Sequence, residues 1–160
     1  MRLDNRSSSG VMGIRIVWIK KESHLKAGTV QERRHWNSGI WTDIYNLVPT
    51  VGEINGLRSN YSYAMIPGEK REFGNCDMEI ENKKVEPRQE IRGDIARTYF
   101  YMDWAYPGHG IISKKNRDLF DAWDKEDPVD AWECERCKRI GKIQGNENPF
   151  VKKACEKAGL

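Results

Sequence analysis

The chain has 160 residues, which is enough for one domain with a sizeable hydrophobic core. Six tryptophans and six tyrosines indicate a folded protein, and a mean hydropathy of −0.78 argues against any membrane span. A net charge of +3 is too small to indicate a nucleic-acid partner by itself.

Charge is unevenly distributed along the chain. Residues 1–40 carry eight Lys or Arg against three Asp or Glu, whereas residues 41–160 carry 19 against 21. We therefore treat residues 1–40 as a divergent N-terminal region and residues 41–160 as the main domain. Any nucleic-acid surface on the main domain must come from local clustering of basic residues.

An apolar, β-branched run at residues 11–19 predicts a short strand. The same run fails as an export signal, because Arg15 interrupts it and no small-residue cleavage site follows. A mature or truncated chain accounts for this more simply.

Residues 42–60 are the stretch richest in side chains that do chemistry rather than packing. Its candidates are Asp43, Asn46, Glu53, Asn55, Arg58 and Asn60. Hard oxygen donors beside an arginine suit a magnesium-assisted phosphate site. Because Pro49 disfavours helix at Val48, we expect a turn over residues 43–48 and a helical turn or two over residues 51–57.

Two of these candidates have competing interpretations. The carboxamide oxygen of Asn55 suits Mg²⁺, yet an Asn-Gly pair at residues 55–56 also suits the end of a helix. The guanidinium of Arg58 can hold a phosphate with two hydrogen bonds, or form an ion pair with Glu53 or Asp43. Asn46 is expected to bond the backbone of a turn.

Alternating polarity at residues 77–81 predicts a half-buried strand. The basic residues that follow, Lys83, Lys84 and Arg88, suit either a DNA backbone or ordinary solvation. Residues 91–106 predict a helix whose apolar stripe is Ile91, Ile95, Tyr99 and Met102. Arg92 and Arg97 lie off that stripe and are expected to face a substrate groove.

Three further helices are predicted towards the C-terminus. One begins at a Ser113 cap and runs to about Lys125. The next begins at Asp127 and Pro128, buries Val129, Trp132, Ile140 and Ile143, and ends at Gly145. The last is opened by Asn148 and Pro149 and carries Cys155.

Four cysteines are present: Cys76, Cys134, Cys137 and Cys155. They suit disulfides in an exported protein, with three possible pairings. The spacing of Cys134 and Cys137 also resembles half of a zinc site, although no second pair follows.

Several motifs resemble the endonuclease I family. Residues 43–49 read DIYNLVP and residues 52–60 read GEINGLRSN. The resemblance continues in order through residues 73–76 (FGNC), 92–102 (RGDIARTYFYM), 132–136 (WECER) and 144–150 (QGNENPF). It covers roughly residues 41–155, which a chance match does not explain.

The resemblance implies an α+β fold in which a ββα-metal (His-Me finger) element lies among several helices. It implies a disulfide-bonded, periplasmic or secreted endonuclease that uses one Mg²⁺ to hydrolyse DNA with little sequence preference, as a monomer without membrane contact. RNA is left open as a second substrate. Asn55 would be the metal ligand and catalytic residue, and Arg58, Asn60, Arg92 and Arg97 would bind nucleic acid.

The chain departs from the family pattern at its N-terminal end. Endonuclease I enzymes carry a Glu-His pair upstream, in which the histidine is the general base, but the equivalent residues 7–10 read SSSG. The chain offers only His24, His35 and His109. Glu22 and His24 are the nearest match to the pair, but Ser23 lies between them and their distance from the Asn motif differs from that in the family. The general base is therefore unassigned, and we expect a truncated or frameshifted start near residue 41. The alternative function is an impaired relative that binds nucleic acid without cutting it.

Overall fold

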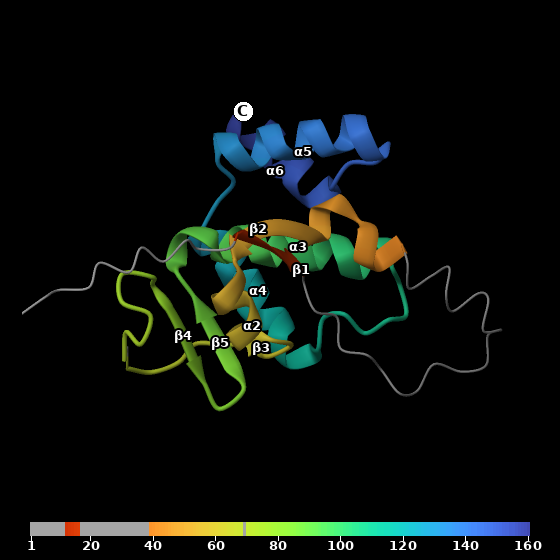
Figure 1. The fold of residues 1–160 in the computed structure, drawn as a ribbon. Coiled ribbons are helices and arrows are strands. Elements are labelled where there is room, and N and C mark those ends of the chain that lie inside the picture. Colours follow the sequence, from red (N-terminus) through yellow and green to blue (C-terminus); the bar gives the residue numbers. More distant parts are fainter. Residues whose placement is uncertain (1–11, 17–38, 69) are drawn as a thin grey trace, which may run out of the picture.

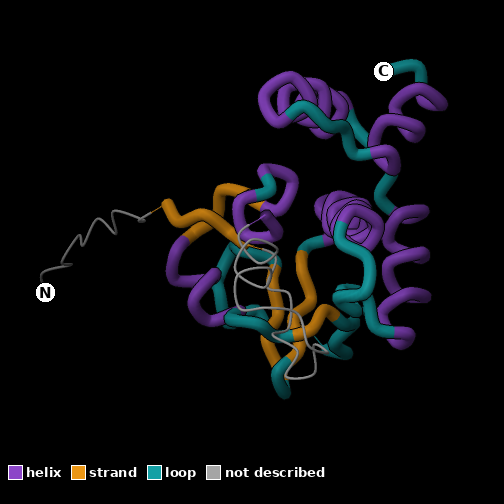
Figure 2. The backbone as a smooth tube through the Cα atoms, turned by 90° about the vertical axis from the view of Figure 1, so that its right-hand side faces the viewer, coloured by secondary structure: helices purple, strands orange, loops and turns teal. Residues whose placement is uncertain are grey.

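The computed structural model describes residues 12–16, 39–68 and 70–160. Figure 1 shows α5 (Ala131–Gln144) and α6 (Pro149–Ala158) on one side of the central helix α3 (Arg92–Ala105). Helix α4 (Lys114–Glu126) and a small sheet lie on the other side of α3, and Figure 2 shows the same arrangement after a quarter turn. This mixed architecture agrees with the expected α+β class.

The first sheet joins two segments that are distant in sequence. Strand β1 (Met12–Ile16) pairs antiparallel with β2 (Leu47–Val51), with Gly13 opposite Thr50. Helix α2 (Gly52–Arg58) follows β2 at once, which completes a ββα element. The strand expected at residues 11–19 is confirmed over residues 12–16, and its other residues lie outside the described ones; the helix expected at residues 51–57 is confirmed as α2.

The turn expected over residues 43–48 is shorter than predicted. It is the 3-10 helix η1 (Ile44–Asn46), and the chain is already extended from Leu47. The sequence analysis predicted no strand at residues 47–51. The steric effect of Pro49 that excludes helix at Val48 also favours extended backbone at that residue, so it promotes β2.

The second sheet has the order β3 (Ser62–Tyr63), β5 (Lys84–Pro87), β4 (Met78–Glu81). Strands β4 and β5 form a hairpin, and its two turn residues Asn82 and Lys83 have φ of 50° and 59°. Positive φ at both turn residues matches the right-handed twist of paired strands. The strand expected at residues 77–81 is confirmed.

Helix α3 is more deeply buried than its predicted stripe implied. Nine of its 14 residues are buried, because two separate hydrophobic clusters pack against it. One contains Ile95, Tyr99 and Phe100 with residues of α4 and β5, and the other contains Tyr101 and Met102 with residues of α5 and α6. The helix is therefore the centre of the core rather than an amphipathic surface helix.

The C-terminal helices match the sequence analysis except at the start of α5. Ser113 caps α4, Gly145 ends α5 with φ of 85°, and Asn148 caps α6. The cap of α5 is Asp130 and not Asp127, because Asp127 ends α4 and its carboxylate accepts a hydrogen bond from the Gly93 N–H.

The predicted buried face of α5 is only partly correct. Trp132 and Ile143 are 58% and 75% exposed. The positions facing α3 and α6 are instead filled by Cys134, Cys137 and Ile140. No helix in the described part of the chain is both long and apolar enough to cross a membrane.

A disulfide joins Cys134 of α5 to Cys155 of α6. The zinc interpretation of Cys134 and Cys137 is therefore wrong, since the Cys134 thiolate is not available. Cys137 is a buried free thiol and Cys76 an exposed one.

Breaking the disulfide by the double substitution Cys134→Ser and Cys155→Ser should lower the free energy of unfolding by about 3 kcal/mol. The bond closes a loop with a sequence separation of 21, and the restriction of the unfolded chain has roughly that value. Urea unfolding measures the change, and the exposed Cys76→Ser variant is the matched control. Equal stability of the two variants would contradict the expectation.

Candidate functional site

The ββα element places Asn55 inside helix α2 and not at its end. Helix α2 continues to Arg58, and its C-cap is Ser59 with φ of 48°. The alternative interpretation of Asn55 as a helix cap is therefore wrong. The Asn55 side chain is half-buried and its oxygen Oδ1 is inaccessible to solvent.

Arg58 lies at the last turn of α2 but does not reach the surface. Its side chain is 2% exposed, and its guanidinium lies 4.9 Å from the centre of the Tyr63 ring. Within the described residues no ion pair joins it to Glu53, which is exposed, or to Asp43. The described structure thus places the Arg58 guanidinium against Tyr63 and not at the surface, and its contact with a DNA phosphate stays a prediction. Asn60, two residues further on, is exposed.

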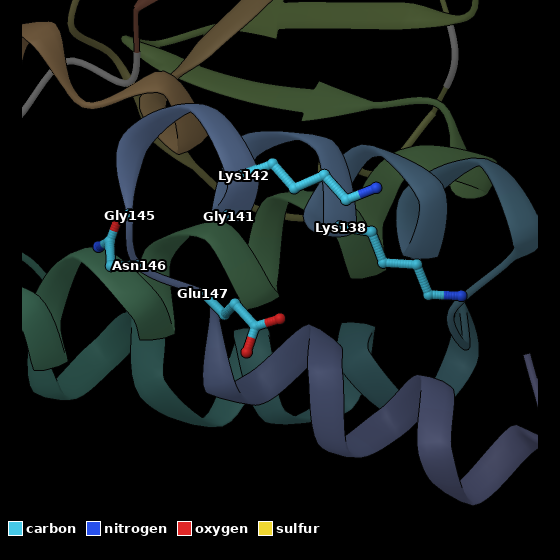
Figure 3. A pocket seen from close by; sticks show the side chains of 6 residues that line it. All are labelled: Lys138, Gly141, Lys142, Gly145, Asn146 and Glu147. Carbon is cyan, nitrogen blue, oxygen red and sulfur yellow. The ribbon is translucent and has the colours of Figure 1, made fainter.

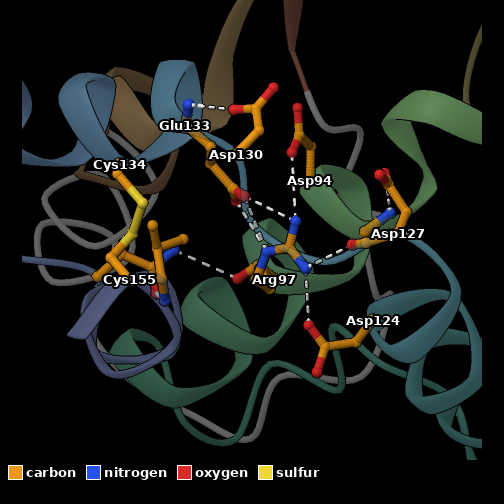
Figure 4. Close-up of polar contacts among 11 residues, drawn as sticks. Asp94, Arg97, Asp124, Asp127, Asp130, Glu133, Cys134 and Cys155 are labelled. Atoms are coloured by element: carbon orange, nitrogen blue, oxygen red, sulfur yellow. Dashed lines mark hydrogen bonds and ion pairs between the residues drawn. A yellow bond between two sulfur atoms is a disulfide. The ribbon is translucent and has the colours of Figure 1, made fainter. Parts of the chain in front are cut away.

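Arg97 is also placed differently from the prediction. Its side chain is 1% exposed and lies among acidic groups from three helices (Figure 4). Nη2 lies 2.6 Å from Glu133 and 3.3 Å from Asp94, and Nη1 lies 2.9 Å from both Asp124 Oδ1 and the Asp127 carbonyl. Arg97 therefore holds α3, α4 and α5 together and does not face a substrate groove.

Arg92 has a similar structural role. It bonds Glu86 at 2.7 Å and the Pro87 carbonyl at 3.0 Å, which ties α3 to strand β5. Its guanidinium lies 5.7 Å from the centre of the Trp123 ring. Arg92 is half-buried in this position, and its contact with nucleic acid stays a prediction. Lys83, Lys84 and Arg88 are exposed.

The segment that leads into the ββα element is fixed by a buried carboxylate. Asp43 is 4% exposed. Its Oδ2 accepts hydrogen bonds from the hydroxyls of Tyr101 at 2.8 Å and Tyr106 at 3.0 Å. Its Oδ1 accepts from the Tyr45 N–H at 2.9 Å and from Gln144 Nε2 at 3.1 Å. Burial and the nearby carboxylate raise the pKa of both tyrosines, which remain hydrogen-bond donors at neutral pH.

Arg136 of α5 also binds residues 43–47, through their backbone carbonyls. One of its terminal nitrogens donates to the carbonyls of Ile44 at 3.1 Å, Tyr45 at 3.3 Å and Leu47 at 3.1 Å. These carbonyls end the short helix η1, where a cation is favourable. Burial lowers the pKa of Arg136. Asn46 Nδ2 donates to the Ile40 carbonyl at 3.1 Å, in line with its expected backbone role.

Sequence reasoning missed this anchoring of residues 43–47. Asp43 was considered as a candidate oxygen donor and as an ion-pair partner of Arg58, and Arg136 only as part of a matching motif. A usable signal was present, since Glu133 and Arg136 occupy the same face of α5 as the buried Cys137. Residues 43–47 run directly into β2 and α2, so the position of Asn55 depends on α3 and α5.

Among the candidates of the ββα element, Asn55 carries the kind of oxygen donor that a divalent ion with few protein ligands would need. Mg²⁺ keeps several waters and binds through one or two protein oxygens, and the Asn55 carboxamide oxygen is a suitable donor. Within residues 12–16, 39–68 and 70–160, no group of three or more His, Cys, Asp or Glu side chains is arranged to hold a metal ion. His24 and His35 lie outside the described residues, and His109 lies in the α3–α4 connection.

A family model for endonuclease I matches residues 18–155. The chain belongs to the endonuclease I family. The match begins within residues 1–40, the region that the sequence analysis set apart. The ββα-metal architecture expected for the endonuclease I family agrees with the β1–β2–α2 element.

The chain is also similar to individual proteins that are named as nucleases. An endonuclease-1 from Buchnera aphidicola is 49% identical over 120 residues, covering 74% of this chain and 47% of the relative. A periplasmic deoxyribonuclease from Aeromonas hydrophila is 44% identical over 118 residues, covering 71% and 48%. An extracellular ribonuclease from Bacillus amyloliquefaciens is 31% identical over 164 residues, covering 92% and 53%. The chain thus spans about half the length of the curated relatives it matches.

Replacing Arg136 with Gln should destabilise the segment that positions α2. Three carbonyls would lose a charged donor, for which we expect a loss of about 2 to 3 kcal/mol in the free energy of unfolding. Urea unfolding measures the loss, and faster hydrogen exchange of the β2 amides would localise it. Arg139→Gln is the control, because Arg139 is 73% exposed on the same helix; equal effects of the two variants would refute the anchoring role.

The ionisation of Glu133 should make stability depend on pH. The pKa of Glu133 is raised to about 7, chiefly by burial; the hydrogen bond from Arg97 opposes this rise and the Asp94 carboxylate adds to it. Because the folded-state pKa lies above the unfolded value, the proton on Glu133 stabilises the fold below about pH 4.5, and this contribution is lost as the pH rises through about 7.

The measurement is urea unfolding of Glu133→Gln at several pH values between these limits. The variant should have a flatter profile than the parent, because the amide does not titrate. Glu135→Gln, which changes an exposed carboxylate two residues away, should keep the parent profile. A parent stability that rises across the whole interval would contradict the assigned direction.

Proposed function

We propose that this chain is the metal-binding part of an endonuclease that hydrolyses phosphodiester bonds in DNA with the help of Mg²⁺. The observation that carries the proposal is Asn55, a hard oxygen ligand on the helix that directly follows a two-stranded sheet, in a chain of the endonuclease I family. The nuclease names of the relatives support it.

Asn55, Asn60 and the residues that anchor α2 would each have a distinct part in this function. Asn55 would hold the ion through its carboxamide oxygen, on a helix kept in place by Asp43 and Arg136. When bound, the ion stabilises negative charge on the scissile phosphate and on the leaving oxygen. Asn60 is exposed just after α2 and would contact the sugar-phosphate backbone there. Such contacts do not read bases, so binding would be insensitive to sequence and weakened by salt.

RNA is a second candidate substrate. The extracellular ribonuclease from Bacillus amyloliquefaciens aligns with 92% of the chain, a larger share than the DNA-cutting relatives cover. We further propose that the protein acts outside the cytoplasm as a monomer, which the periplasmic and extracellular names of its relatives support for the location. The remaining alternative is a relative that binds nucleic acid but lacks the general base.

Plasmid cleavage in low salt with Mg²⁺, with and without EDTA, tests the proposal. Nicking should require the metal and should fall by about a hundredfold or more in Asn55→Ala, as expected for loss of a metal ligand. The control is Gln89→Ala, which removes an exposed carboxamide on the short helix η2 (Gln89–Ile91). A single-stranded RNA in the same assay compares the two substrates.

Three results would distinguish the alternatives. EDTA-sensitive cleavage that survives in Asn55→Ala would refute the assigned ligand. Salt-dependent DNA binding by a folded parent that cuts neither substrate would favour the impaired relative. If the parent cuts, His24→Ala is the next variant, since a histidine is needed to activate water.

A further inference from the structure

Positive charge is concentrated at the C-terminal end of the main domain. Residues 41–136 carry 13 Lys or Arg against 19 Asp or Glu, whereas residues 137–160 carry six against two. The net charge therefore changes from −6 to +4 at the middle of α5. An otherwise acidic domain has one strongly basic end, which is the pattern of local clustering that a polyanion requires.

Two of these basic residues, Lys138 and Lys142, line a hollow between α5 and the start of α6. Its lining residues are Lys138, Gly141, Lys142, Gly145, Asn146 and Glu147, and its volume is about 420 Å³. Figure 3 shows Lys138 and Lys142 extending from α5 on one side and Glu147 on the other. We call this feature the α5–α6 hollow.

The charge balance of the hollow is positive. Lys138 and Lys142 are four residues apart, so their side chains extend from neighbouring turns on one face of α5. Within the described part of the chain, no ion pair is recorded for either of them. The single carboxylate in the lining, Glu147, forms an exposed ion pair with Lys152 Nζ at 2.5 Å. Two ammonium groups remain to hold an anion.

Gly141 gives the hollow its shape. A Cβ at this position would lie 2.9 Å from Glu147 Cγ, so any larger residue would push Glu147 away from α5. The α5–α6 connection therefore packs closely against α5 at Gly141, and this contact forms one wall of the hollow.

We propose that the α5–α6 hollow is a second contact for the sugar-phosphate backbone of DNA, in which Lys138 and Lys142 hold one or two phosphates. The inference rests on the proposed function. Helices α2 and α5 lie on different sides of α3 (Figure 1), so this contact would add affinity for long duplexes without taking part in the reaction at Asn55. Lysines act here as point charges, which makes the contact independent of base sequence.

The test compares Lys138→Gln/Lys142→Gln with Lys114→Gln/Lys115→Gln. The control pair removes two exposed lysines from the first turn of α4, so it changes the net charge equally. Binding of a fluorescent, random-sequence DNA duplex is measured by anisotropy in EDTA between about 50 and 200 mM salt. Metal-dependent cleavage by the parent is measured separately.

The slope of log affinity against log salt concentration should be smaller by about 2 in Lys138→Gln/Lys142→Gln, the α5 variant. The reason is that each lost phosphate contact reduces the slope by roughly 0.9, and this variant loses two lysines. The loss of affinity across this salt range should then be roughly tenfold smaller than in the parent. The control pair should retain the parent slope. Equal slopes in all three proteins, or no duplex binding by the parent at the lowest salt, would overturn the proposal.

The outcomes separate this inference from the proposed function. If the parent binds DNA through the hollow but does not cut it, the proposed contact stands and the proposed nuclease activity is refuted. If the parent cuts DNA and the salt slope of binding is unchanged in Lys138→Gln/Lys142→Gln, the nuclease activity stands and the proposed contact is refuted. If the α5 lysines are needed instead for binding vesicles of anionic phospholipid, while duplex binding is unaffected, a membrane surface replaces DNA as the ligand.

Discussion

The buried carboxylate of Asp43 is the constraint on which the rest of this structure depends. A carboxylate withdrawn from water is costly unless hydrogen bonds replace its hydration. Four donors do so here, from Tyr101 and Tyr106 at the end of α3, from Gln144 of α5, and from the Tyr45 backbone. Because these groups lie far apart in the sequence, the carboxylate is satisfied only when α3 and α5 are both in place.

Arg136 completes this arrangement by binding the carbonyls at the end of η1. The segment between Asp43 and Leu47 is therefore held at its start by an anion and at its end by a cation. Since β2 and α2 follow without a connecting loop, the segment transmits this placement to Asn55. The small ββα element is thus positioned by α3 and α5, which are not part of it.

Helix α5 links three parts of the molecule. Its inner face bears Arg136 and the Glu133 carboxylate that holds Arg97, and Cys134 ties it covalently to α6. Its outer side bears Lys138 and Lys142. The buried ion pair of Arg97 and Glu133 is stable only because further carboxylates and a carbonyl complete the guanidinium's hydrogen bonds. One helix thus positions the candidate metal ligand and presents the basic end of the domain.

The sequence by itself determined the family, the α+β class, and most of the helices. Caps such as Ser113 and Asn148 act within one turn of chain, so they can be read locally. The tertiary structure alone decided which charged residues are buried. Arg58 and Arg97 look like phosphate ligands in sequence, and Asp127 looks like a helix cap, because an isolated charge does not reveal its distant partners. Burial depends on contacts between segments as far apart as Arg97 and Glu133, and those contacts exist only once the helices have packed.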